Sequence, residues 1–163
     1  MTMPIWILAA GLGGALLYAS ASDLRSRTIP NQLNAAIALA APLWWLAWGL
    51  PLWPGVAMQL GFAVVMFMVF AAMFAVGAMG GGDVKLIAAL TLWLPPGLLP
   101  AMLMVMAFAG LALTIAMFVL HARRTVVAGG ALGTAWARRR AVAVPYGVAI
   151  AIGGAWALSR TLF

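Results

Sequence analysis

Long apolar stretches alternate with short polar or helix-breaking segments along the whole chain. This pattern predicts six helical segments, near 4–22, 33–50, 55–79, 84–94, 97–120 and 144–162. A helix needs roughly 20 apolar residues to cross a bilayer, and most of the segments approach that length. The fourth segment is the exception, since its length corresponds to only about 17 Å of helix. The pattern therefore predicts an all-α, polytopic integral membrane protein with about six transmembrane helices, the fourth being short or re-entrant.

Composition strengthens this interpretation. Hydrophobic residues make up 67% of the 163 residues and charged residues only 7%, which leaves too little polar surface for a soluble fold. We therefore expect residues 1–163 to form one membrane-embedded domain, with a basic cytoplasmic loop at about 121–143.

The basic residues indicate the orientation of the helices. Eight of the nine Lys and Arg residues fall on one side of the six-segment arrangement, and Arg160 alone falls on the other. The positive-inside rule makes that side the cytoplasm of a bacterial inner membrane, so both termini lie outside. The net charge of +7 is thus explained by orientation among membrane lipids, and no nucleic-acid partner is expected. Tryptophans then gather at the outer interface, namely Trp6, Trp45, Trp48, Trp53 and Trp93.

Residues that bind metals are scarce. The chain has no cysteine and a single histidine, His121, so a thiolate zinc site is excluded and an imidazole site has no second ligand. We expect no metal and no cofactor.

The only two acidic residues are Asp23 and Asp83. On the predicted topology, Asp23 closes the first segment and Asp83 the third, so both lie at the cytoplasmic level. Ionisable groups at membrane depth are costly and are usually functional. Two carboxylates that share one proton are the machinery of an aspartic protease, in which one activates water and the other polarises the scissile carbonyl. We therefore expect Asp23 and Asp83 to be catalytic.

Local sequence predicts different environments for the two carboxylates. Asp83 opens a helix, where free N–H groups favour its ionised form, whereas Asp23 ends one, so we expect Asp23 to hold the shared proton more often. The three glycines Gly80, Gly81 and Gly82 leave the backbone open to a substrate strand beside Asp83.

Further residues are expected to shape the site. Asn31 is predicted to cap the second segment, and Lys85 to anchor the cytoplasmic side. Pro145-Tyr146-Gly147 opens the last segment on the same level, where the Tyr146 hydroxyl is positioned to donate a hydrogen bond into the site.

Three sequence blocks resemble the motifs of type IV prepilin peptidases, and especially of the short form associated with tight-adherence (Flp) pili. The first block runs from Asp23 through Leu24-Arg25-Ser26-Arg27-Thr28-Ile29-Pro30 to Asn31; the others are Gly80-Gly81-Gly82-Asp83-Val84-Lys85-Leu86 and Val144-Pro145-Tyr146-Gly147-Val148-Ala149. The second contains the family's G-x-G-D signature.

This resemblance implies removal of a basic leader from a prepilin, after a glycine, at the cytoplasmic face. It also implies that Asp23 and Asp83, at the matching motif positions, are the catalytic pair. Larger members of the family carry a cytoplasmic domain whose paired C-x-x-C motifs bind zinc and accompany methylation. Because this chain has no cysteine, a peptidase without methyltransferase activity is expected.

Two other kinds of function remain open from the sequence. The same two aspartates would suit a small proton- or cation-coupled transporter, although that function needs polar residues near mid-membrane, where Gln59 and a few Ser and Thr are present. A non-enzymatic membrane factor of pilus assembly would make the two aspartates incidental. An intramembrane protease of the presenilin kind also carries G-x-G-D, but its Tyr-Asp and Pro-Ala-Leu motifs do not occur here.

Overall fold

The computed structural model describes residues 3–127 and 144–163, which form a bundle of helices. The bundle contains α1 (Met3–Ser26), α2 (Asn31–Ala47), α3 (Ala57–Ala75), α4 (Gly81–Thr91), α5 (Leu99–Val127) and α7 (Tyr146–Leu162). A π-helical turn, Leu52–Val56, leads into α3, and a 3-10 turn, Pro96–Leu98, leads into α5. No strand occurs in these residues, so the predicted all-α class is confirmed.

Three stretches are long and apolar enough to cross a bilayer. They are Met3–Ser26, Leu52–Ala75 and Pro96–Arg123. Their outer surfaces are apolar as well: Met68 on α3 and Phe108 on α5 are each about two-thirds exposed, at 64% and 66%. Contact of large apolar side chains with lipid is favourable, whereas their exposure to water is unfavourable. The molecule is a polytopic membrane protein.

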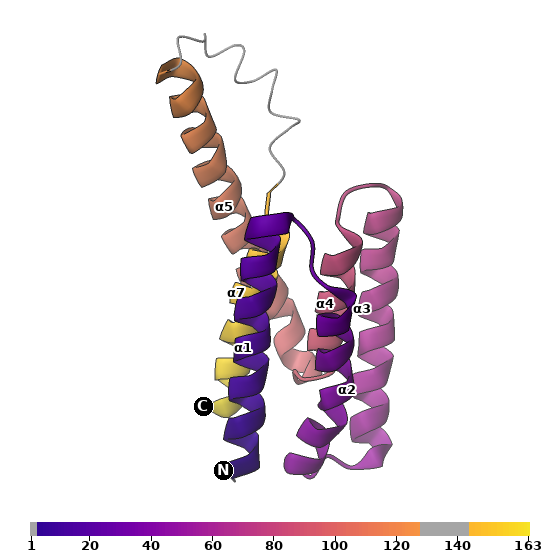
Figure 1. Cartoon of the computed structure of the whole chain (residues 1–163). Helices are drawn as coiled ribbons and strands as arrows, with labels where there is room; N and C mark the ends of the chain where they lie inside the picture. The colour runs from indigo at the N-terminus through magenta and orange to yellow at the C-terminus, as the bar shows by residue number, and fades with distance from the viewer. Residues whose placement is uncertain (1–2, 128–143) are drawn as a thin grey trace.

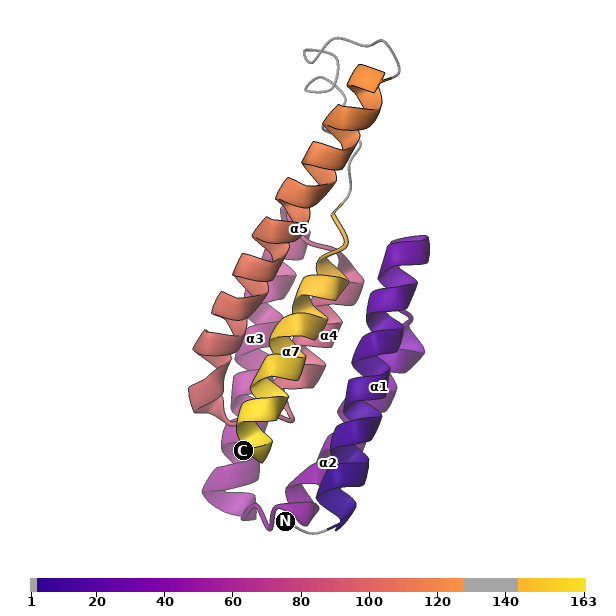
Figure 2. The same cartoon turned by 90° about the vertical axis from the view of Figure 1, so that its left-hand side faces the viewer.

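Helix α4 lies in the middle of the bundle. It packs against α2, α3 and α7, while α7 packs against α5 and α1 (Figures 1 and 2). Helix α4 is short and apolar around most of its circumference. Its buried residues are Val84, Leu86, Ile87, Ala89, Leu90 and Thr91. A helix that is apolar on nearly all sides is stable only when neighbours surround it. The central position of α4 therefore follows from its composition.

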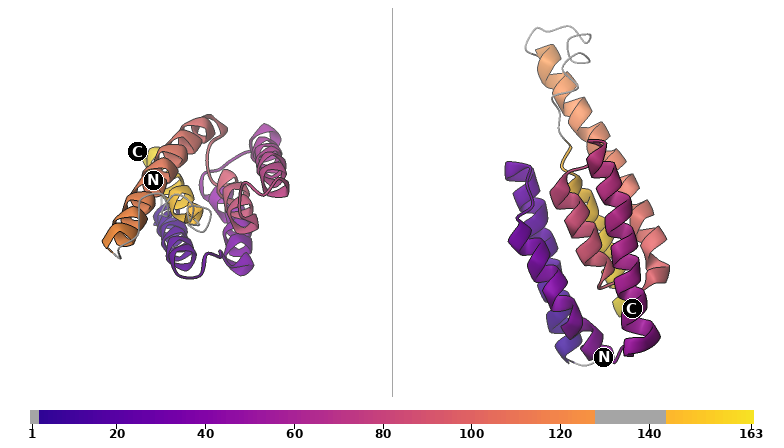
Figure 3. Two further views of the ribbon diagram at one scale, coloured as in Figure 1. Left: turned by 90° about the horizontal axis from the view of Figure 1, so that it is seen from above. Right: turned by 90° about the vertical axis from the view of Figure 1, so that its right-hand side faces the viewer.

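The two ends of the bundle differ in the parts of the chain that they contain. The chain termini lie at one end, and the carboxyl end of α1 and the amino ends of α4 and α7 lie at the other (Figures 1 and 3). The predicted alternation of the six segments is thus observed. We call the end that contains Asp23 and Asp83 the aspartate end.

Several predicted boundaries need correction. Helix α1 continues to Ser26, so Asp23 lies inside its last turns, and α4 begins at Gly81, three residues before the predicted start. Helix α5 continues to Val127, so the predicted basic loop at about 121–143 begins later than expected. The remainder of that loop, 128–143, lies outside the described residues.

The contact between α5 and α7 depends on Gly153. A Cβ atom there would lie 2.9 Å from the Met102 carbonyl oxygen and 3.1 Å from Met106 Cβ, whereas at Gly14 on α1 it would meet nothing within 4 Å. Gly153→Ala is expected to cost about 1–3 kcal/mol through overpacking. Gly14→Ala is expected to be neutral or stabilising by about 0.5–1 kcal/mol. Thermal unfolding in detergent micelles measures both; equal melting temperatures for the two variants would contradict the packing described here.

Candidate active site

Asp23 is buried at the aspartate end, with only 6% of its surface exposed. Its Oδ2 atom accepts a hydrogen bond from the Gly147 backbone N–H, at 2.8 Å. Gly147 is the second residue of α7, so this N–H belongs to the first helical turn, where backbone donors have no partner within the helix. The positive end of α7 therefore faces the Asp23 carboxylate and stabilises negative charge on it.

This contact requires a glycine at position 147. A Cβ atom there would lie 2.9 Å from Asp23 Oδ2, 3.0 Å from Asp23 Cβ and 3.0 Å from Ile29 Cδ1. All three distances are shorter than ordinary van der Waals contact. Gly147 thus lets α7 approach α1 closely enough for its N–H to reach the carboxylate.

Asp83 lies in the first turn of α4, outside the three stretches that are long enough to cross the bilayer. Burial of its carboxyl group raises the pKa of Asp83 most, the negative charge of Asp23 raises it further, and a hydrogen bond with the Gly80 backbone lowers it. The result is a pKa of about 6, compared with an ordinary value of 3.8. The two carboxyl groups are therefore close enough to interact.

This direction differs from the expectation about the shared proton. The sequence favoured Asp23 as the protonated member, because Asp83 opens a helix and Asp23 ends one. Burial and the neighbouring charge instead make Asp83 the carboxyl group with the raised pKa. Asp23 in turn lies against the amino end of a second helix, α7. This contact could not be expected from the position of Asp23 at the end of α1.

Two residues that the sequence did not single out bring the aspartates together. The Cδ1 atom of Ile29 lies 3.0 Å from the position that a Cβ on Gly147 would take, and its Cβ lies 3.2 Å from the position that a Cβ on Gly82 would take. Asn34, which is buried, donates a hydrogen bond from Nδ2 to the Gly82 carbonyl oxygen at 3.1 Å. The segment around the start of α2 thus holds the turn before Asp83 against α1 and α7.

The glycines before Asp83 serve close packing more than open access. A Cβ on Gly81 would lie 3.3 Å from the ring of Phe74, and one on Gly80 would lie 2.9 Å from Asp83 Oδ2. Gly80 itself has an ordinary negative φ of −74°. Side chains at these positions would push away α3, Ile29 or the carboxylate.

The other predicted site residues occupy different places. Lys85 donates a hydrogen bond to Asn31 Oδ1 at 2.8 Å, and neither aspartate forms an ion pair with a described residue. Asn31 is the first residue of α2 and makes no side-chain cap, so its predicted capping role is wrong.

The residues at the start of α7 also differ in their surroundings. Pro145 is fully buried immediately before α7. The Tyr146 ring lies beside Gly110 of α5, and Gly147 makes the contact with Asp23.

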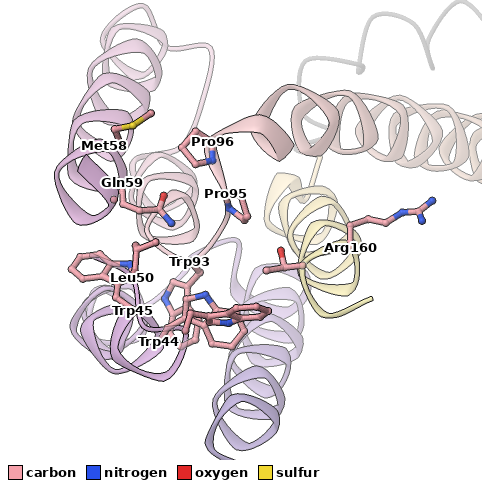
Figure 4. Close-up of a pocket in the computed structure, with 12 residues that line it drawn as sticks. Trp44, Trp45, Leu50, Met58, Gln59, Trp93, Pro95, Pro96 and Arg160 are labelled. Carbon is pink, nitrogen blue, oxygen red and sulfur yellow. The ribbon is translucent and has the colours of Figure 1, made fainter. Parts of the chain in front are cut away.

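A cavity of about 400 Å³ lies at the opposite end of the bundle, near the termini (Figure 4). Aromatic rings dominate its wall, including Trp44, Trp45, Trp48 and Trp93, as expected for the tryptophan-rich interface. Gln59 also lines it, and its Oε1 atom has no hydrogen-bond partner in the described chain. Because no carboxylate lines this cavity, it is not the candidate active site.

The described residues contain no cluster of three His, Cys, Asp or Glu side chains able to hold a metal ion. The site consists of two interacting carboxyl groups at one end of a helical membrane bundle. Fold and site together define a polytopic membrane protein with a paired-carboxylate site.

Comparison with known families identifies the class. The model of the type IV leader peptidase family matches residues 10–115, and the chain belongs to this family of membrane proteases. The match includes Asp23 and Asp83 but ends before the block at 144–149. No curated protein and no solved structure matched the chain significantly.

Because the chain has only two aspartates, labelling with ¹³C-aspartate reports on the site alone. We expect one side-chain carboxyl signal to titrate near pH 6 and to disappear in Asp83→Asn. In Asp23→Asn the pKa of Asp83 falls, since one of the two causes that raise it is removed, but stays above 3.8 because the carboxyl group is still buried. A pKa of Asp83 that does not change in Asp23→Asn contradicts the interaction.

Gly147→Ala tests the packing of α7 against Asp23. The added methyl group displaces the carboxylate from the Gly147 N–H, so proteolytic activity is expected to fall on the order of 100-fold, as displacements of about 1 Å in active sites do. Gly110→Ala is the matched control, because a Cβ there would meet the Tyr146 ring at an ordinary 3.6 Å. Similar cleavage rates for the two variants would show that Gly147 has no such role.

Proposed function

We propose that this protein is an aspartic prepilin peptidase that removes the basic leader of Flp-type prepilins at the cytoplasmic face, with Asp23 and Asp83 as catalytic residues. The observation that carries the proposal is the interaction between the chain's only two acidic side chains, which are sixty residues apart in the sequence. The family match supports peptide hydrolysis, and a prepilin-type substrate in general. The Flp-type substrate rests on the resemblance of the three sequence blocks.

The two carboxyl groups have complementary roles in this proposal. Asp23, which accepts the Gly147 N–H, is the base that takes a proton from water as the water oxygen bonds to the scissile carbonyl carbon. Asp83 retains its proton to higher pH than an ordinary aspartate, and it donates that proton to the carbonyl oxygen. When the C–N bond breaks, Asp23 returns its proton to the leaving amine and Asp83 recovers its own. Neither a metal nor a cofactor takes part.

The proposed orientation rests on charge. On the six-segment arrangement predicted from the sequence, eight of the nine basic residues fall on the side of Asp23 and Asp83, whereas Arg160 falls on the other. By the positive-inside rule the aspartate end faces the cytoplasm of the bacterial inner membrane, and both termini face outside. This places the site where a basic leader is retained after the pilin's apolar segment enters the bilayer.

A single membrane-embedded peptidase domain over residues 1–163 is part of the proposal. The absence of cysteine means that no thiolate zinc site can form in these residues. We therefore propose hydrolysis without methyltransferase activity. Gly80, Gly81, Gly82, Pro145 and Gly147 shape the site by allowing close contacts or fixing helix starts.

Co-expression with a candidate Flp-type prepilin, in a host that lacks such peptidases, tests this function. Leader removal is followed by gel shift for the wild type, Asp23→Asn and Asp83→Asn. Each substitution removes one proton-transfer group, so cleavage is expected to fall at least about 100-fold. Arg160→Gln, which alters a charge at the opposite end, controls for expression and insertion and is expected to cleave normally. Cleavage at the wild-type rate by both Asn variants would overturn the proposed mechanism.

A further inference from the structure

A groove of about 520 Å³ opens between α2 and α3, and α4 forms its floor. One end of the groove is polar, with Asn31, Asn34 and Lys85. The remainder is apolar and includes Ala35, Ala38, Leu60, Ala63, Val64, Phe67 and Leu92. Since Leu60, Val64 and Phe67 are exposed at 48%, 61% and 43% on a membrane-spanning helix, the groove opens toward lipid.

Lys85 at the polar end forms no ion pair with any residue that the structure describes. It is exposed and donates to Asn31 Oδ1. Each residue of a helix is rotated by about 100° around the helix axis, so residues two positions apart lie on nearly opposite sides. Lys85 and Asp83 therefore lie on opposite sides of α4. The other aspartate, Asp23, interacts with Asp83. Neither acidic side chain of the chain pairs with Lys85, so this cation is available to an anion from outside the protein.

Asn34 provides a second, independent sign of a ligand. Its side chain is 4% exposed and lines the groove, and its Oδ1 atom has no hydrogen-bond partner among the described residues. A buried acceptor without a donor is unfavourable, so a ligand that supplies a hydroxyl group is favoured. The polar end thus offers one cation and one unsatisfied acceptor beside an apolar channel.

We propose that this groove binds one anionic phospholipid with a hydroxylated headgroup, of the phosphatidylglycerol type. The phosphate accepts hydrogen bonds from Lys85, a headgroup hydroxyl donates to Asn34 Oδ1, and an acyl chain lies along Ala35, Ala38 and Leu92. A substrate helix fits these observations less well. The groove lies on the side of α4 away from Asp83, and a basic leader carries the same sign of charge as Lys85.

The lipid is connected to the active site through Asn34. This side chain donates from Nδ2 to the Gly82 carbonyl oxygen, next to Asp83, while its Oδ1 atom contacts the headgroup. If the proposed function is correct, the bound anion also offsets the charge of Lys85 and attracts the basic leader to a face that would otherwise repel it. Only this second consequence rests on the proposed function.

Retention of lipid measures the site directly, without any prepilin. The protein is reconstituted in bilayers with equal amounts of phosphatidylglycerol and phosphatidylethanolamine, extracted in mild detergent, and examined by native mass spectrometry. We expect the wild type to retain phosphatidylglycerol preferentially. Lys85→Gln is expected to lower this preference about fivefold, as the loss of one interfacial cation predicts. Arg123→Gln removes an exposed cation elsewhere and is expected to leave the preference unchanged.

A second pair of variants tests the apolar channel. Ala35→Phe fills the groove and is expected to reduce retention of either lipid, whereas Ala36→Phe points into the separate groove between α1 and α2 and is expected not to. Equal behaviour within either pair of variants overturns the proposal, as does equal retention of the two lipids by the wild type. Cross-linking of a pilin helix to position 35, with lipid retention unchanged in Ala35→Phe, would assign the groove to the substrate instead. Failure to cleave any prepilin would count against the proposed function and leave the lipid result intact.

Discussion

The hydrogen bond from the Gly147 backbone N–H to Asp23 Oδ2 joins the first and last helices of the bundle, and the site depends on it. Asp23 is buried and forms no ion pair with a described residue, so its carboxylate has few sources of stabilisation. The structure supplies helix ends in place of cations: Asp23 lies against the amino end of α7, and Asp83 lies in the first turn of α4. Both helices therefore have to begin at the same level, beside α1.

Packing around short side chains meets that requirement. Ile29 lies between Gly147 and Gly82, so a single apolar residue in the α1–α2 connection contacts both helix starts. Asn34 fixes the turn before Asp83 by its hydrogen bond to the Gly82 carbonyl. Helix α4 packs against α2, α3 and α7 and begins at the aspartate end, where its first turn carries Asp83. It ends at Thr91, shortly before Pro95 and Pro96. The same geometry turns Lys85 away from the aspartates and toward the lipid-facing groove.

Much of this architecture could be predicted from the sequence. Apolar periodicity gave six segments at nearly the observed positions, since alternation of apolar runs with charges and breakers is a local property. The scarcity of acidic residues identified Asp23 and Asp83, and the fold brings them to the same end of the bundle, where the charge of Asp23 contributes to the raised pKa of Asp83. The roles of Ile29 and Asn34 could not be predicted, because they depend on contacts across 48 or more residues. The environments of the two carboxyl groups could not be predicted from the dipoles of their own helices, because burial, the charge of Asp23 and the amino end of α7 arise only on folding.

The central claim is that Asp23 and Asp83 lie side by side at the aspartate end, and cross-linking in the membrane tests it most directly. Because the chain has no cysteine, Asp23→Cys combined with Asp83→Cys supplies the only two thiols. A short bifunctional thiol reagent is predicted to join them within one molecule. The pair Asp23→Cys with Lys85→Cys, whose second position lies on the other side of α4, is predicted to react far less. Equal cross-linking of the two pairs, or none in the first pair although each cysteine is labelled singly, would contradict the account.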